Sequence, residues 1–176
     1  SYLLHTVELP MEMQELSGEV KVTGRNKAGG ISVAHLFSSA KTEQAIVDTF
    51  FCAPTNWKNE KNAQGKALKY PNHWHFSSTT VPCKTARFLT IMDTHGNNRP
   101  DMAVTRKGNT VQVGDWTITC NLTEKGNAAI SISNKAEKVS LNYDAGKKEG
   151  ATIVTDQVKG KKVNKVLTDY LPDFEI

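Results

Sequence analysis

The chain has 176 residues, of which 38% are hydrophobic and 23% are charged, and its formal net charge is +4. This length fits one domain with a full hydrophobic core and is short for two domains. The apolar runs fall well short of the ~18 residues of a membrane-spanning helix, so we expect a globular chain without a membrane partner.

The start of the chain is the strand-like segment Ser1-Tyr2-Leu3-Leu4-His5, with no initiator methionine, basic leader or small-residue cleavage site. We therefore expect the C-terminal fragment of a larger protein. Residues 1–176 are predicted to form a single β-sandwich region. The alternative is a subdivision near 94–110, after which 110–176 forms a hairpin meander and a tail.

Short segments rich in β-branched and aromatic residues recur along the chain, separated by Gly, Asn, Asp and Lys clusters. This pattern is typical of antiparallel sheets. The predicted strands are 2–6, 18–23, 31–37, 45–51, 73–78, 86–93, 110–113, 116–122, 128–133, 138–143 and 151–155. The predicted fold is therefore all-β, an antiparallel β-sandwich of the supersandwich kind, with one short C-terminal helix as an option.

A polar insertion at 56–71 interrupts this pattern and is long for a loop in a compact domain. It combines aromatic rings, which stack on the apolar faces of sugars, with amines that bind sugar hydroxyl or acidic groups. Its candidate carbohydrate-binding residues are Trp57, Lys58, Lys61, Lys66, Lys69 and Tyr70. The alternative is that these side chains serve packing or contacts between domains.

The next segment, 71–78, is dense in histidine and aromatic residues. In a strand, His73 and His75 project from one face, and Trp74 and Phe76 project from the other. The favoured interpretation places both aromatic rings in the core and both imidazoles on a polar face. No cofactor is then expected. The alternative is a zinc or calcium half-site at His73 and His75, and zinc needs a further ligand. Candidates for that ligand are His95, Asp93 and Cys83.

The positive charge is concentrated in the middle of the chain. Residues 51–110 contain nine Lys and Arg against three Asp and Glu, whereas 1–50 contain four against six and 111–176 contain nine against nine. Such an excess can attract an anionic polymer, although solvated loop lysines give the same count more often. No nucleic-acid partner is expected, because the excess is modest and no RNP-like aromatic pattern accompanies it.

Hairpin turns are predicted in the second half of the chain. The segments 107–109, 113–115 and 124–127 each place a glycine between two predicted strands. The strand 116–122 alternates apolar and polar side chains, as a half-buried antiparallel strand does. The tail 158–170 fits either a short amphipathic helix or a final strand pair.

Three cysteines, Cys52, Cys83 and Cys120, lie far apart and lack the spacing of a zinc ribbon or a redox motif. Buried free thiols are the favoured interpretation, with one disulfide as the alternative. The sequence also lacks a GxSxG elbow, a P-loop, an HExxH motif and a dinucleotide fingerprint. No catalytic residue is therefore assigned.

The order of four strand motifs resembles the C-terminal β-domain of heparinase II/III-like polysaccharide lyases. In that family an LLH strand precedes a glycine-led strand, a tryptophan strand and an F-L-x-V-L strand. The matching segments here are 2–6 (YLLHT), 29–37 (GGISVAHLF), 72–76 (NHWHF) and 86–92 (ARFLTIM). The likeness covers residues 1–122, and the lysine-rich insertion departs from the family pattern.

The resemblance implies an upstream α/α-toroid catalytic domain that cleaves uronic-acid-containing polysaccharides, such as heparan sulfate or alginate, by β-elimination. None of the matched motifs is catalytic in that family. The expected function is therefore an accessory β-sandwich domain, inactive alone, that supports the toroid. Its expected partners are an acidic polysaccharide and the upstream domain, and its expected location is periplasmic or exported. The alternatives are an independent carbohydrate-binding module and a purely structural or adhesive sandwich.

Overall fold

A computed structural model describes residues 2–7, 9–48, 61–66, 73–123, 125–146, 152–158 and 161–167. These residues form strands and turns, and none of them belongs to a helix that could cross a membrane. The strands are β1 (Tyr2–Val7), β2 (Glu12–Leu16), β3 (Glu19–Arg25), β4 (Gly30–Ser38), β5 (Thr42–Val47), β6 (His73–Thr80), β7 (Phe88–Gly96), β8 (Val104–Lys107), β9 (Thr110–Val113), β10 (Trp116–Cys120), β11 (Ala129–Asn134), β12 (Val139–Asp144), β13 (Thr152–Val158) and β14 (Lys161–Leu167). The predicted all-β fold is confirmed.

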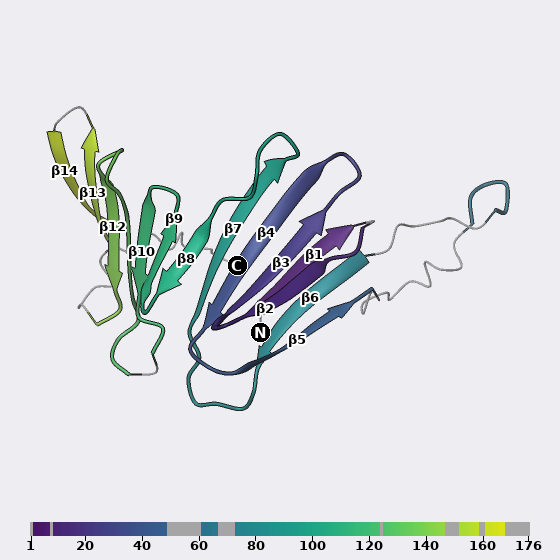
Figure 1. The fold of residues 1–176 in the computed structure, drawn as a ribbon, viewed down its shortest axis with the longest axis horizontal. Coiled ribbons are helices and arrows are strands. Elements are labelled where there is room, and N and C mark those ends of the chain that lie inside the picture. The colour runs from purple at the N-terminus through teal and green to yellow at the C-terminus, as the bar shows by residue number, and fades with distance from the viewer. Residues whose placement is uncertain are drawn as a thin grey trace, which may run out of the picture. The chain divides into compact units, whose positions relative to one another are not determined.

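The chain divides into two compact units, and Figure 1 labels most of their strands. The first unit contains residues 1–86 and 90–101, and the second contains residues 87–89 and 102–176. Strand β7 therefore begins in the second unit and continues in the first. The main division lies between Asp101 and Met102.

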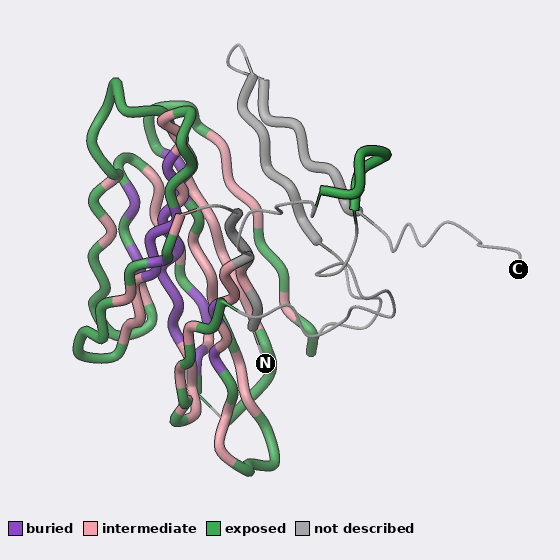
Figure 2. Tube along the Cα trace, turned by 90° about the vertical axis from the view of Figure 1, so that its right-hand side faces the viewer, coloured by how far each residue is buried: buried purple, intermediate pink, exposed green. Residues whose placement is uncertain are grey.

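The first unit is a β-sandwich. A three-stranded sheet in the order β1-β6-β5 packs against a four-stranded sheet in the order β2-β3-β4-β7. Apolar side chains from both sheets form one core. Figure 2, which is coloured by burial, shows the buried residues gathered along a few strands. The core residues are Met11, Val22, Ala34, Leu36 and Phe76, with Leu4, Met13, Val20, Ile46 and Trp74 packed against them. The predicted core positions of Trp74 and Phe76 are confirmed.

Alternation along each strand decides which side chains reach this core. In β3, Val20 and Val22 contact the core, so Lys21 between them points to the opposite face. Strand β4 is buried on both faces, because Val33 on the opposite face is also fully buried. This explains the nearly continuous apolar run of β4 in the sequence.

The second unit is a seven-stranded sheet in the order β14-β13-β12-β11-β10-β9-β8, so each strand pairs with its neighbour in sequence. The predicted meander of hairpins is confirmed. Two-residue turns join β8 to β9 and β9 to β10, and Gly108 and Gly114 adopt positive φ angles of 60° and 52° in them. Because a side chain is strained there, glycine fixes both turns and hence the register.

The structure corrects several predicted elements. Strands β2 and β8 were not predicted, because EMQEL contains no β-branched residue and VTRK is only four residues long. Both are edge strands held by one neighbour. Strand β5 begins at Thr42 and ends at Val47, earlier than the predicted 45–51. The tail pairs as strands β13 and β14, so the helical alternative is wrong for Lys161–Leu167.

The cysteines differ in their surroundings. Cys120 is a buried free thiol, as predicted, and burial raises its pKa while the charge of Arg106 acts in the opposite direction. Cys83 is also free but exposed, so the prediction of burial is wrong for this residue. It lies in the turn-rich segment after β6, which carries no strand pattern to bury it. Cys52 lies outside the described residues.

Candidate carbohydrate-binding site

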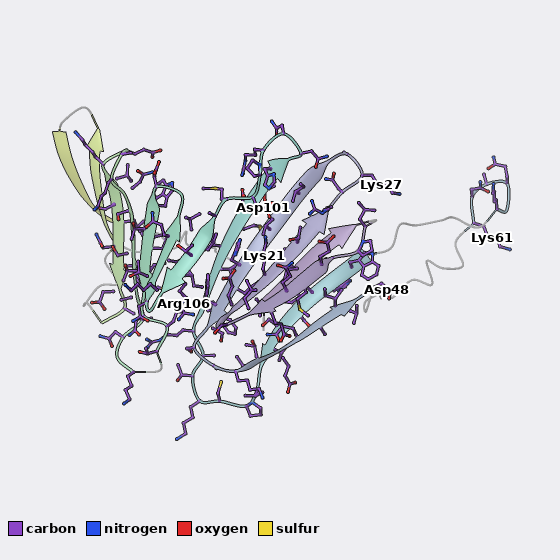
Figure 3. The ribbon with its side chains drawn as sticks, in the orientation of Figure 1. Lys21, Lys27, Asp48, Lys61, Asp101 and Arg106 are labelled. Atoms are coloured by element: carbon purple, nitrogen blue, oxygen red, sulfur yellow. The ribbon has the colours of Figure 1, made fainter. Side chains whose placement is uncertain are left out.

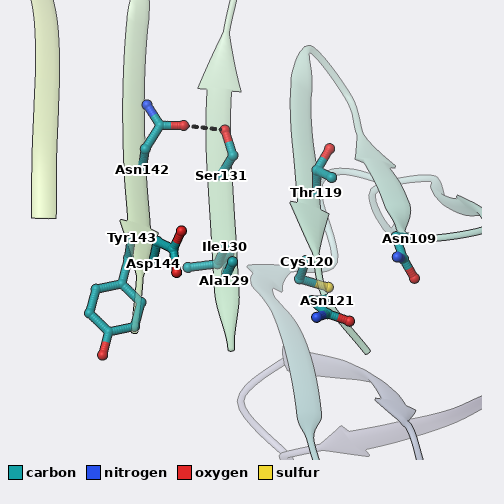
Figure 4. Close-up of a pocket in the computed structure, with 10 residues that line it drawn as sticks. All are labelled: Asn109, Thr119, Cys120, Asn121, Ala129, Ile130, Ser131, Asn142, Tyr143 and Asp144. Atoms are coloured by element: carbon teal, nitrogen blue, oxygen red, sulfur yellow. Dashed lines mark hydrogen bonds between the residues drawn. The ribbon is translucent and has the colours of Figure 1, made fainter. Parts of the chain in front are cut away.

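A hollow of about 430 Å³ lies in the second unit where β10, β11 and β12 run side by side (Figure 4). Five of its ten lining residues have polar uncharged side chains and one has a carboxylate, while the side chains of Cys120, Ile130 and Tyr143 belong to the opposite face of the sheet. The lining residues are Asn109, Thr119, Cys120, Asn121, Ala129, Ile130, Ser131, Asn142, Tyr143 and Asp144. This volume is in the range of small-ligand pockets.

Strand register brings these residues together. Ser131 of β11 pairs with Thr119 on one side and with Asn142 on the other, and Ala129 pairs with Asp144. Directly paired residues share a face of the sheet, so these five side chains lie on one face. The methyl group of Ala129 is the smallest of them, which leaves room between its longer neighbours.

Residues 121–123 and 125–127, which form a loop beside the hollow, are held by side-chain hydrogen bonds. Asn121 Nδ2 donates to the carbonyls of Lys125 at 3.0 Å and Asn127 at 2.9 Å. The Arg87 guanidinium donates hydrogen bonds to the carbonyls of Asn121, Gly126 and Asn127, so these bonds hold the guanidinium against the loop. The loop is therefore a built feature of the unit, and Asn121 serves the loop more than a ligand.

Other polar groups of the hollow keep hydrogen-bonding capacity for a ligand. Asn142 Oδ1 accepts the Ser131 hydroxyl at 2.6 Å, and within the described part of the chain its amide Nδ2 has no partner. Asp144 Oδ1 accepts the backbone N–H of Gly146 at 2.9 Å, which fixes the carboxylate and leaves Oδ2 to accept another donor. Tyr143 is 37% exposed, but it lies between Asn142 and Asp144 on β12, so its ring points to the opposite face of the sheet.

A second hollow of about 300 Å³ lies on the opposite face of the same strands and shares five lining residues with the first. The shared residues are Cys120, Asn121, Ala129, Ile130 and Tyr143. It adds the exposed ring of Phe88 and the side chains of Leu89 and Leu122, so it is more apolar. The apolar rings of the second hollow are therefore separated by the sheet from the amides, hydroxyls and carboxylate of the first.

The insertion predicted to bind carbohydrate is described only at residues 61–66. Lys61 and Lys66 are exposed at the two ends of a turn, and Lys61 is labelled in Figure 3. Asn62 closes the turn, since its N–H donates to the Lys66 carbonyl and its Oδ1 accepts the Lys66 N–H, both at 2.9 Å. Trp57, Lys58, Lys69 and Tyr70 lie outside the described residues, so this site stays a prediction.

The predicted metal half-site lies on β6. His75 follows the core-facing Trp74, so it points to the outer face of the three-stranded sheet, where it is half-buried. The structure describes the backbone of His73 but not its side chain. Among the described residues, no three His, Cys, Asp or Glu side chains are close enough to hold a metal ion.

The additional ligands considered for zinc lie elsewhere. Asp93 and His95 belong to β7 of the other sheet, and Cys83 is exposed in the segment after β6. Lys21 Nζ lies 3.0 Å from Asp101 Oδ2, and His95 Nε2 lies 3.2 Å from Asp101 Oδ1 (Figure 3 labels Lys21 and Asp101). Because Lys21 points away from the core, this group lies on the outer face of the four-stranded sheet.

This group is a network of paired charges that the sequence did not reveal. Arg99 donates two hydrogen bonds to the buried carboxylate of Asp93, which raises the pKa of Arg99. His95 Nε2 also lies 3.8 Å from Asp93, and its Nδ1 lies 2.7 Å from the Gly96 carbonyl. The carboxylates already have cationic partners. We therefore interpret the network as a structural tie that holds 97–101 over the sheet.

The network makes stability depend on pH. Hydrogen bonding from Lys21 and then from His95 lowers the pKa of Asp101, against the opposing effect of burial. A lowered folded-state pKa stabilises the protein above the unfolded value of about 3.9, and this contribution is lost as the pH falls through the folded value. We expect Asp101→Asn to destabilise the protein more at about pH 6 than at about pH 3. Urea unfolding at both pH values measures this, and an equal loss at both would contradict it.

Comparisons with known proteins give no assignment. No family model matches this chain, and a search of curated proteins finds no match. The resemblance to heparinase II/III-like lyases therefore stays a prediction from four sequence motifs.

Proposed function

We propose that this chain binds carbohydrate through the hollow between β10, β11 and β12, as a non-catalytic accessory region of a polysaccharide-degrading protein. One observation carries the proposal. Amide, hydroxyl and carboxylate side chains surround the small Ala129 on one face of the sheet.

Sugars require this combination of groups. Each sugar hydroxyl both donates and accepts a hydrogen bond, so an amide donor beside a carboxylate acceptor matches two neighbouring hydroxyls. In the hollow, Asn142 supplies the donor and Asp144 supplies the acceptor. Each contact is weak, and their convergence within one hollow gives a usable affinity.

The accessory role is supported by the sequence. The four strand motifs resemble a non-catalytic β-domain, and the sequence contains none of the catalytic motifs GxSxG, P-loop or HExxH. The proposed parent is a polysaccharide lyase with an upstream toroid, acting in the periplasm or outside the cell. In that setting the hollow keeps the enzyme on its polymer while the chemistry occurs elsewhere.

We expect Asn142→Ala to weaken glycan binding by about tenfold, because it removes one converging contact. Affinity electrophoresis of the full chain against a panel of neutral and acidic polysaccharides measures the effect. Asn98→Ala, at an exposed turn of the first unit, is the matched control and should bind like the wild type.

The insertion provides the competing site. If Trp57→Ala together with Tyr70→Ala abolishes binding while Asn142→Ala has no effect, the hollow is not the binding site. Binding that survives the double substitution and is lost in Asn142→Ala supports the proposal.

A further inference from the structure

The seven-stranded sheet carries two rows of polar side chains that run across its strands. In one row, Lys107 pairs with Thr110, Thr110 with Thr119, Thr119 with Ser131 and Ser131 with Asn142. The second row is Thr105, Gln112, Thr117, Ser133 and Ser140. Pairing across strands places each row on one face, and the rows are two residues apart along every strand, so both share that face. We name these ten residues the polar ladder.

The polar ladder is accessible and its members are oriented by one another. All ten side chains are exposed or half-buried. Thr117 Oγ1 donates to Gln112 Oε1 at 2.9 Å, Thr110 and Thr119 hydroxyls lie 3.3 Å apart, and Ser131 donates to Asn142. A hydroxyl has one donor and two acceptor sites, so each keeps capacity for a ligand while its neighbour fixes its direction.

The polar ladder has fewer charged side chains than an ordinary solvent-exposed sheet face. Lys107, on the edge strand β8, is the single charged residue among the ten, whereas solvent-facing strand positions commonly carry Lys and Glu. The hollow continues the ladder through Thr119, Ser131 and Asn142, and it adds the carboxylate of Asp144. A uronate at the hollow would meet this carboxylate as a like charge, which opposes binding.

We propose that the polar ladder binds an extended, uncharged polysaccharide chain that runs across β8 to β12 with one sugar in the hollow. This inference rests on the proposed function and specifies its ligand. Neighbouring strands are about 4.8 Å apart, so five strands span about 19 Å, which is the length of several sugar residues. A uronate-containing polymer would be held here through its uncharged residues.

Titration calorimetry of the full chain tests the inference with uncharged cello-, xylo- and manno-oligosaccharides, each as a disaccharide and a hexasaccharide, and with a uronate hexasaccharide. We expect an uncharged hexasaccharide to bind at least about tenfold more tightly than its disaccharide, because only the longer chain reaches the ladder. The uronate hexasaccharide should bind about tenfold more weakly, and Asp144→Asn should narrow that difference.

Thr117→Val isolates the ladder from the hollow, because it removes one hydroxyl outside the hollow and valine suits a strand. It should weaken hexasaccharide binding about fivefold and leave disaccharide binding unchanged. Thr94→Val, which removes a hydroxyl 3.4 Å from Ser32 in the first unit, is the matched control and should alter neither. The inference is overturned if Thr117→Val leaves hexasaccharide binding unchanged, or if the uronate hexasaccharide binds most tightly. In either case, weaker binding by Asn142→Ala would still support the proposed function. If no glycan binds, both fail.

Discussion

Replacing Phe76 with alanine is expected to lower the free energy of unfolding of the first unit by about 3–5 kcal/mol. Phe76 is fully buried and contacts core side chains of the four-stranded sheet from β6. The substitution removes a large apolar side chain and leaves a cavity where the two sheets meet, and both effects are unfavourable. Hydrogen exchange of β3, β4 and β6 during urea unfolding assigns the loss to this unit.

Leu16→Ala is the matched control for Phe76→Ala. Leu16 ends the edge strand β2 and is 51% exposed, so its removal should cost less than about 1 kcal/mol. Equal losses for the two variants would contradict the position of the core between the sheets. Phe76→Leu should fall between them, because it keeps part of the buried volume.

Asp93→Ala is expected to lower the stability of the same unit by about 2–3 kcal/mol. The Asp93 side chain is 4% exposed and accepts two hydrogen bonds from Arg99. Its removal also takes a negative charge from the side of the buried His95. Arg99 is partly exposed and can return to water, which keeps the cost below that of a fully buried pair.

Glu12→Ala separates this buried pair from an ordinary surface one. Glu12 lies 3.9 Å from Arg25 in the same sheet, and both side chains are well exposed. An exposed pair of this kind contributes about 0–1 kcal/mol, so Glu12→Ala should change stability little. Urea unfolding of both variants compares them, and a loss for Asp93→Ala no larger than for Glu12→Ala would show that the network is not a structural tie.

Local sequence patterns predicted most of the fold. Alternation and β-branched residues located the strands that bury one face, and glycines located the tight hairpins at Gly108 and Gly114. The same patterns missed β2 and β8, because an edge strand is held by its neighbour and not by its own composition. The spacing of apolar residues in the tail did not decide between a helix and a strand pair, because it fits the periodicity of both.

The candidate site depends on information that local patterns do not contain. Thr119, Ser131 and Asn142 meet only through the register of three strands, and each alone is an ordinary polar strand residue. Lys21 and Asp101 are 80 positions apart in the chain and meet through the folding of one loop over a sheet. The insertion drew attention because its aromatic and basic residues are neighbours in sequence.

The most direct test of the account is to map glycan contacts on the folded chain. Amide chemical shifts of the chain 1–176, recorded during titration with the polysaccharide selected by affinity electrophoresis, locate the bound sugar. We predict that the largest changes fall at residues 119–121, 129–131 and 142–144, around the hollow. Changes confined to the insertion at 56–71, or no changes with any glycan in the panel, would contradict the account.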